Sequence, residues 1–156
     1  MATAKRLGII ASHGSLDAAY PPLILATSAV ALDMEAAIFF TFYGLEIVKK
    51  DKADKLKVAA IGNPAMPVKI PTLVGALPGM SAMATRMMNS WMDKAGTAKV
   101  SELLEVAIAS GVRLIACQMT LDVLGIERDE LIDGIEIGGA ATFLDYVSED
   151  AIALTF

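Results

Sequence analysis

The chain has very few residues of the types that build disulfides and metal centres. Its 156 residues include one cysteine, Cys117, and one histidine, His13. One cysteine excludes an internal disulfide, and it fits the reducing conditions of the cytoplasm. One cysteine with one histidine gives none of the ligand spacings that are typical of zinc sites. We therefore expect no metal ion, no disulfide framework and a cytoplasmic protein.

Basic runs, nucleotide motifs and long apolar runs are also missing. The formal net charge is −5, and the run Lys49-Lys50-Asp51-Lys52 is better explained as a solvated turn with acids nearby. Nucleic acid is therefore not an expected partner. No GxGxxG or GxxxxGK[ST] motif occurs, so we expect no bound cofactor. The longest uncharged stretch, residues 70–85, is shorter than the ~20 residues of a spanning helix and contains prolines and glycines, so we expect no integral membrane segment.

Apolar residues are abundant instead. They make up 55% of the chain although aromatics are only 6%, so aliphatic side chains and methionine supply the excess. Such a composition favours a buried parallel sheet together with apolar contacts between subunits. The length is that of one domain, which we assign to residues 1–156. We expect a homo-oligomer.

Strand-like and helix-like segments alternate along the chain. The expected strands are Lys5–Ser12, Ala36–Phe42, a weak Val58–Ile61, 112–118, Ile135–Ile137 and Ala151–Phe156. The expected helices are Leu16–Leu32, 80–94, 98–110, Arg128–Ile132 and Ala140–Glu149, with a helical turn at Thr120–Gly125. This alternation predicts an α/β fold with a mostly parallel sheet and right-handed crossovers.

Cys117 lies near the end of the apolar run 112–118, just before a helical turn that Gly125 closes. In open α/β sheets, sites form at the carboxyl ends of the strands. The N–H groups at the start of the following helix would favour the thiolate. Two explanations stay open at this point. The cysteine is either a small residue packed in the core, as free cysteines often are, or a reactive thiol.

Polar residues and glycines follow two other predicted strands. His13 and Gly14 follow the first strand, and Tyr43 and Gly44 follow the second. With Gln118, which follows the cysteine, these are the candidate substrate-binding residues. If the strands are parallel, all of them lie at one edge of the sheet, and we expect His13, Tyr43 and Cys117 around one crevice.

A methionine-rich helix is predicted over residues 80–94. Met80, Met83, Met87 and Trp91 share one face of it. Methionine stripes are usually core or interface filler, and an interface between subunits is one explanation. The Pro- and Gly-rich stretch 62–79 precedes the helix, so a mobile lid over residues 62–92 is the alternative.

The sequence around the cysteine, Ala116-Cys117-Gln118-Met119-Thr120-Leu121-Asp122-Val123-Leu124-Gly125-Ile126, resembles the DsrE/DsrF/DsrH-like family, in its DsrE-type, peroxiredoxin-like branch. Supporting segments are 6–12, 40–45, 78–80, 131–134 and 138–143. The resemblance covers nearly the whole chain.

The resemblance implies a flavodoxin-like three-layer fold and a sulfur-relay role. It implies that Cys117 is the catalytic residue, taking sulfane sulfur as a persulfide or thiosulfonate and passing it to another thiol protein, such as a TusA-like carrier. A chain with one thiol cannot resolve a persulfide internally, so the sulfur must leave to a second molecule. Whether the protein acts as a sulfurtransferase or as a carrier stays open. The alternatives are a non-catalytic small-molecule or nucleotide-binding module, or an assembly subunit, with Cys117 as a packing residue.

Overall fold

The computed structural model describes residues 5–59, 77 and 79–156 of the chain. Its centre is a five-stranded sheet in the order β4-β3-β2-β1-β5, in which every strand pairs parallel to its neighbour. The strands are β1 (Arg6–Ala11), β2 (Glu35–Phe40), β3 (Arg113–Cys117), β4 (Ile135–Gly138) and β5 (Ala151–Thr155). The three central strands, β3, β2 and β1, are almost entirely buried, which explains why their sequences are nearly continuous apolar runs.

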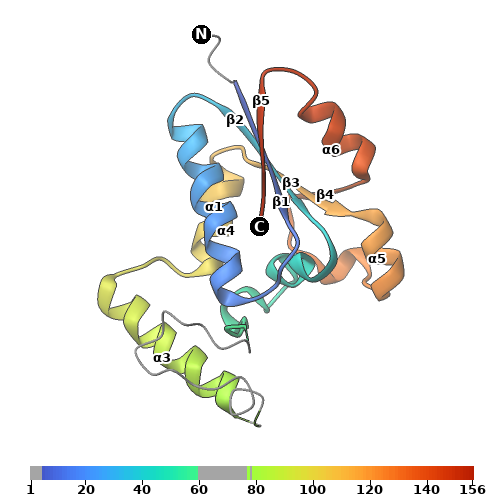
Figure 1. Cartoon of the computed structure of the whole chain (residues 1–156). Coiled ribbons are helices and arrows are strands. Elements are labelled where there is room, and N and C mark those ends of the chain that lie inside the picture. The colour runs from blue at the N-terminus through green and yellow to red at the C-terminus, as the bar shows by residue number, and fades with distance from the viewer. Residues whose placement is uncertain (1–4, 60–76, 78) are drawn as a thin grey trace.

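Helices cover both faces of the sheet, which confirms the predicted three-layer, flavodoxin-like α/β fold. Helices α1 (Leu16–Ala31) and α4 (Val100–Ala109) lie side by side on one face, and α6 (Ala140–Tyr146) lies on the other (Figure 1). Helix α5 (Gln118–Leu124) follows β3 directly at the carboxyl end of the sheet. Helix α3 (Met80–Ala95) projects away from the sheet (Figure 1).

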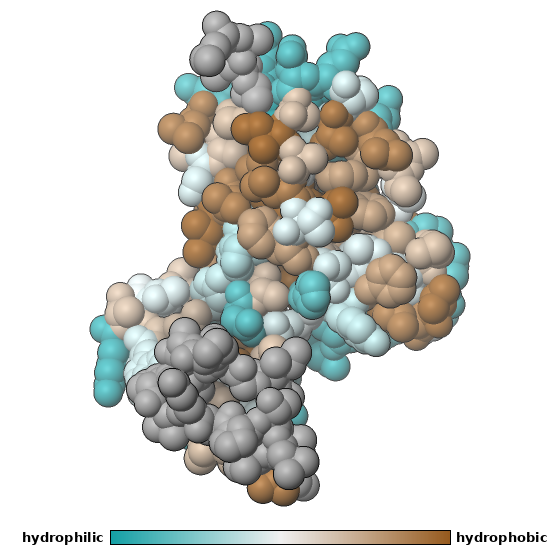
Figure 2. Space-filling view, viewed as in Figure 1, coloured by the Kyte–Doolittle hydropathy of each residue, from teal (hydrophilic) through white to brown (hydrophobic). Residues whose placement is uncertain are grey.

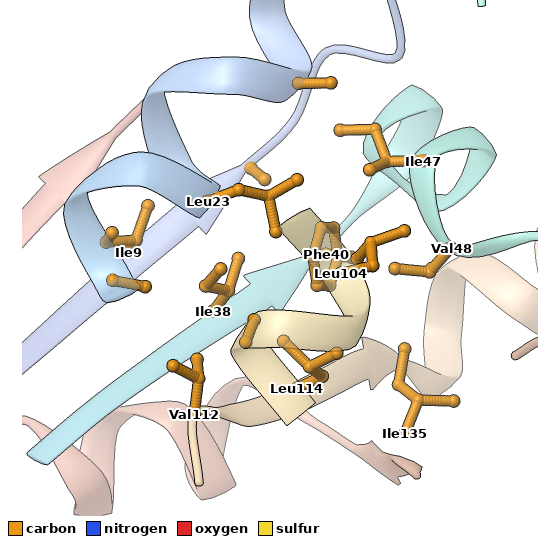
Figure 3. Close-up of a cluster of buried hydrophobic side chains, with 14 of the residues drawn as sticks. Ile9, Leu23, Ile38, Phe40, Ile47, Val48, Leu104, Val112, Leu114 and Ile135 are labelled. Atoms are coloured by element: carbon orange, nitrogen blue, oxygen red, sulfur yellow. The ribbon is translucent and has the colours of Figure 1, made fainter. Parts of the chain in front are cut away.

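The larger hydrophobic core lies between the sheet and the α1/α4 layer. Aliphatic side chains of β1, β2 and β3 meet Leu23 of α1 and Leu104 of α4, as Figure 3 shows. Ile47 and Val48, from the 3-10 helix Phe42–Val48, close the core near the carboxyl end of the sheet. This packing fixes the ends of β2 and β3, from which the candidate site is built.

The second face has a smaller core under α6. Phe143 of α6 stacks on Phe39 of β2 with ring centroids 5.5 Å apart, and both belong to a cluster that includes Cys117. Gly8 in β1 allows α6 to approach, because a Cβ at that position would collide with a Val147 methyl carbon. The thiol therefore belongs to the thinner of the two cores.

Several predicted boundaries were wrong by a few residues. The second strand ends at Phe40 rather than Phe42, because Phe42 has a φ of +46° and begins a 3-10 helix. Gln118 belongs to α5 rather than to the strand before it. Residues 128–130 form a 3-10 helix that is shorter than predicted, and α6 ends at Tyr146 rather than Glu149.

The weak strand prediction Val58–Ile61 was not confirmed in the two of its residues that are described. Val58 and Ala59 have no regular secondary structure, and residues 60 and 61 lie outside the described residues. Most of the stretch 62–79, including the part of the predicted lid before α3, also lies outside them. The predicted solvated turn is confirmed for residues 50–52, which are exposed and form a turn, whereas the Lys49 side chain is only 16% exposed and pairs with Glu46. Lys52 also pairs with Glu46, and Lys50 pairs with Asp133.

Candidate functional site

Three strands deliver polar residues to one edge of the sheet. The register pairs Ala11 with Phe40 and Phe40 with Ala116, so the ends of β1, β2 and β3 lie side by side. His13 and Thr41 lie in the segments that follow β1 and β2, and Cys117 is the last residue of β3. The ends of β1 and β2 are also joined by backbone hydrogen bonds, in which Thr41 N–H donates to the Ala11 carbonyl at 3.0 Å and Gly44 N–H donates to the Ser12 carbonyl at 3.2 Å.

Cys117 is the last residue of β3 and is only 5% exposed. It packs with Ala37, Phe39, Ile115 and Phe143 in the smaller core. Burial of this degree is compatible with a packing role. It also means that access to the sulfur, and not only its pKa, controls how fast a reagent reacts with it.

Two threonine hydroxyls lie beside the cysteine. Thr120, in the first turn of α5, is 1% exposed, and its Oγ1 is 3.1 Å from the Oγ1 of Thr41. The Phe42 N–H donates to Thr120 Oγ1 at 3.2 Å. A buried hydroxyl that already accepts a hydrogen bond has its own proton free to donate. The pair therefore places two hydroxyl groups next to a single sulfur.

The surroundings of Cys117 act on its pKa in opposite directions. Burial is the largest influence and raises the pKa of the thiol. Hydrogen bonds to the sulfur from the Thr120 hydroxyl and N–H, from the Thr41 hydroxyl and from the Met119 N–H together outweigh it, and the pKa falls below its ordinary value. A lowered pKa increases the thiolate fraction at neutral pH, and the thiolate is the nucleophilic form.

The side chains of His13 and Gln118 form hydrogen bonds with residues other than the two threonines. His13 is exposed, and its Nδ1 is 3.0 Å from Ser12 Oγ. Because Ser12 Oγ donates to the Phe156 carbonyl at 2.8 Å, His13 Nδ1 is the donor to Ser12. Gln118 is exposed, and its Nε2 donates to Asp122 Oδ1 at 2.8 Å. Both side chains are available to a ligand at the edge of the sheet.

Gly14 and Gly44 have a packing reason to be glycine. A Cβ on Gly14 would collide with the Tyr43 carbonyl oxygen, and a Cβ on Gly44 would collide with the Ala11 carbonyl oxygen. Each glycine thus allows the loop after one strand to press against the backbone of the next. Tyr43 is 69% exposed and lines a cavity with Gly14. Cys117 is not among the residues that line that cavity.

The residues that sequence reasoning missed are Thr41, Thr120 and Phe42. Thr120 lies three residues after the cysteine, in a segment that was predicted only as a helical turn. Its contact with Thr41 joins positions 79 residues apart in the sequence. Phe42 has a left-handed backbone, which is uncommon for a bulky residue and suggests a functional constraint. That conformation turns its N–H toward Thr120 while half of the residue stays exposed.

Neither a metal centre nor a membrane span is found in the part of the chain that the structure describes. No group of three or more His, Cys, Asp or Glu side chains is placed to hold a metal ion there. No helix among the same residues is long and apolar enough to cross a bilayer.

Comparison with known proteins identifies relatives over almost the full length. A family model described as "DsrE/DsrF/DrsH-like family" matches residues 3–155. The chain is 47% identical to "Sulfur carrier protein DsrE2" of Allochromatium vinosum over 156 residues, which covers 96% of this chain and 97% of that protein. It is 31% identical to YrkE of Bacillus subtilis over 153 residues, with 96% of each chain covered.

Two solved structures share the fold. The protein of unknown function MTH1491 from Methanobacterium thermoautotrophicum has a TM-score of 0.55 and 12% identity, with 97% of this chain and 98% of that chain covered. The ychN protein of E. coli has a TM-score of 0.54 and 18% identity, with 97% and 99% covered. At these identities the likeness supports the fold alone.

Proposed function

Because this chain belongs to the DsrE/DsrF/DrsH-like family, we propose that it is a sulfur carrier whose working residue is Cys117. The observation that carries the proposal is a single thiol at the carboxyl end of β3, with a pKa that two threonine hydroxyls and two N–H groups help to lower. The relative that is named a sulfur carrier, 47% identical over nearly the full length, supports the same role.

The proposed loading step is a nucleophilic displacement at sulfur. The Cys117 thiolate attacks a sulfane sulfur of a polysulfide, a new S–S bond forms, and the old S–S bond breaks with its electron pair leaving on the shortened polysulfide. With tetrathionate the same attack leaves a thiosulfonate on Cys117 and releases thiosulfate. Both exchanges balance without an external oxidant or reductant.

The proposed unloading step uses a second thiol protein, such as a TusA-like carrier. Its thiolate attacks the outer sulfur of the Cys117 persulfide, and the Cys117 thiolate leaves with the electron pair. A lowered pKa helps this step too, because a more acidic thiol is a better leaving group. Both thiols must be reduced for the cycle to continue, which fits a cytoplasmic setting.

Other groups at the sheet edge have supporting parts in this proposal. His13, Tyr43 and Gln118 are exposed at the same edge of the sheet and would contact the donor or the partner chain. Gly14 and Gly44 would act indirectly, by holding the loops that present these side chains. The carrier is also proposed to be a homo-oligomer, because exposed apolar side chains include Met83 and Trp91 of α3.

Intact mass spectrometry tests the function. After incubation with polysulfide, we expect the wild type to gain the mass of whole sulfur atoms, to lose it on reduction, and to pass it to a reduced thiol protein. The Cys117→Ser variant is the control and should gain nothing. If the native wild type gains no reversible mass and resists alkylation, Cys117 is a packing residue and the chain is a binding module or an assembly subunit.

A further inference from the structure

A basic basin lies at the same end of the molecule as Cys117. It consists of two adjoining cavities of about 420 and 460 Å³, which share Lys55 and Lys57 in their linings. Lys52 lines the first cavity and Arg86 lines the second. We use the name basic basin for these four cations and the two cavities.

The basin differs in charge from the rest of an acidic chain. The formal net charge of the protein is −5, yet the described residues of the two linings include four cations and two acids, Glu46 and Asp93. Glu46 is already paired with Lys49 and Lys52. Among the ion pairs found in the described residues, none involves Lys55, Lys57 or Arg86. Within the described part of the chain, these three cations thus have no carboxylate partner, and Lys55, Lys57 and Arg86 are exposed.

The basin is connected to the thiol through a short series of contacts. Tyr43 lines the first cavity, and its neighbour Phe42 donates its N–H to the hydroxyl of Thr120, a residue of the first turn of α5 directly after Cys117. The wall of the first cavity and the surroundings of the thiol are therefore joined through Phe42 and Thr120.

An apolar rim lies at the ends of β2 and β3. It comprises exposed hydrophobic residues of the 3-10 helix and of α5, namely Phe42, Tyr43, Met119, Val123 and Leu124. Figure 2 shows hydrophobic atoms over the position of α5. Apolar contacts near the reacting group with charged groups at the margin are the usual anatomy of a specific protein interface.

We propose that the basic basin and the apolar rim form one docking surface for the thiol partner of Cys117, and that an acidic segment of that partner lies in the basin. The inference rests on the proposed sulfur-carrier function, because only a relay needs the thiol of a second chain to reach Cys117. Charge complementarity favours this occupant over a basic one. It also increases the rate of encounter, by a factor that depends on ionic strength.

The test uses two activated peptides as probes of the surface. Each has one cysteine, joined as a disulfide to thionitrobenzoate, and the two differ only in flanking glutamates or lysines. Attack by the Cys117 thiolate forms a disulfide with the peptide and releases coloured thionitrobenzoate, which gives the rate. We expect the acidic peptide to react roughly tenfold faster at low salt, and this preference to decrease as salt screens the charges.

Charge reversal in the basin is the decisive comparison. Lys55→Glu with Lys57→Glu should abolish the preference for the acidic peptide and leave the rate with uncharged iodoacetamide unchanged. Lys5→Glu with Lys50→Glu is the matched control, because it changes the net charge equally at positions outside the basin lining. The proposal is overturned if both double variants behave alike, or if the wild type shows no preference.

Other occupants give different results. If inorganic phosphate binds the wild type but not the basin variant, and the peptides show no preference, the basin is a small-anion site and the proposal fails. If light scattering shows a wild-type oligomer that the basin variant loses, again with no peptide preference, a second copy of the chain is the occupant and the proposal also fails. Loading of Cys117 by polysulfide is measured separately by mass, so failure of the docking surface is distinguished from failure of the sulfur-carrier function.

Discussion

At the scale of single residues, the Thr120 hydroxyl links the backbone of one strand end to the thiol of another. It accepts the N–H of Phe42 and lies 3.1 Å from the Thr41 hydroxyl. Its burial makes these partners necessary, since an unpaired hydroxyl in the interior costs about 1–3 kcal/mol. Because its hydroxyl and its N–H both lower the pKa of Cys117, Thr120 favours the thiolate over the thiol.

Replacing Thr120 by valine should raise the pKa of Cys117. The variant removes a hydroxyl that stabilises the thiolate and leaves burial, which acts in the opposite direction. At neutral pH the rate with iodoacetamide should fall about fivefold, the factor that corresponds to a net hydrogen-bond contribution of ~1 kcal/mol. The pH dependence of that rate gives the midpoint directly.

Two control variants separate this electrostatic effect from general damage to the fold. Thr120→Ser keeps the hydroxyl and should restore most of the rate. Thr27→Val removes a hydroxyl that bonds within α1 and should leave the midpoint unchanged. An unchanged midpoint in Thr120→Val would show that Thr120 is a packing residue.

The lowered pKa also predicts how stability depends on pH. An acidic group whose folded-state pKa lies below its unfolded value stabilises the fold above the unfolded pKa, and this contribution is lost as the pH falls through the folded pKa. The free energy of unfolding of the wild type should therefore rise relative to Cys117→Ser between the lowered pKa and the ordinary value of about 8.5. Urea titrations of both proteins from pH 6 to 9 measure it, and a constant difference would contradict the lowered pKa.

The sequence allowed prediction of the cysteine but not of its threonine partners. The position of Cys117 followed from a local pattern, an apolar run that ends before a glycine-closed turn. The roles of Thr41 and Thr120 depend on two segments that meet only after the sheet forms, and a threonine in a short helix gives no local signal. The glycines after the strands were assigned to ligand binding, whereas the structure gives each a close backbone contact that no sequence pattern encodes.

At the scale of secondary-structure elements, Gly44 tests how firmly the loops after β1 and β2 are joined. An alanine there would drive its Cβ into the Ala11 carbonyl oxygen, and backbone cannot move away as a side chain can. We expect Gly44→Ala to lower the free energy of unfolding by about 1–3 kcal/mol, as overpacking commonly does. Gly139→Ala is the matched control, because a Cβ at Gly139 meets nothing within 4 Å. Urea denaturation of the two variants should separate them clearly, and equal stabilities would contradict the close contact between the loops.

Helix α6 covers the second face of the sheet (Figure 1), so its buried aromatic side chain should contribute strongly to the free energy of unfolding. Phe143 is 5% exposed and stacks on Phe39, whereas the next residue, Leu144, is 63% exposed. Phe143→Ala should cost about 3–5 kcal/mol, the usual range for a buried phenylalanine, and Leu144→Ala well under 1 kcal/mol. Because Cys117 packs in the same cluster, Phe143→Ala should also make the thiol easier to alkylate. Similar stabilities for the two variants would show that α6 packs loosely.

The types and order of the main elements could be predicted because hydrophobic periodicity and the glycines that end helices and strands are local signals. The boundaries failed where tertiary contacts decide them. Phe42 looks like the last residue of a strand, yet its left-handed backbone ends β2 two residues earlier and donates to Thr120. Helix α6 ends at Tyr146, where the chain must turn at Asp150 to enter β5, although the sequence would continue the helix.

At the scale of the whole molecule, the sequence predicted the acidic net charge but not its distribution. The sequence placed Lys52 in a solvated turn and indicated no role for Lys55 or Lys57. The structure brings them to Arg86 of α3, about thirty residues further along the chain, at the same end of the molecule as the cysteine. Strand order had the same limitation, because alternating elements imply a parallel sheet without saying that β1 lies between β2 and β5.

The proposed homo-oligomer is the last prediction, and helix α3 is its basis. In the described part of the chain, α3 has no buried residue over sixteen positions, and Met83 and Trp91 are 59% and 40% exposed. The helix projects from the sheet (Figure 1), and although Met88 and Met92 pack against the larger core, Met83 and Trp91 present exposed apolar surface that another subunit could cover. Light scattering at micromolar concentration should give a mass above that of one chain.

Variants on α3 and α1 locate the interface. Met83→Glu places a charge on the exposed methionine face and should shift the protein toward the monomer, since an unpaired charge in an apolar interface is costly. Leu32→Glu is the matched control, because Leu32 is 74% exposed at the end of α1, and it should leave the assembly unchanged. A monomeric wild type would contradict the homo-oligomer itself. An oligomer that dissociates with Leu32→Glu but not with Met83→Glu would instead place the interface on α1.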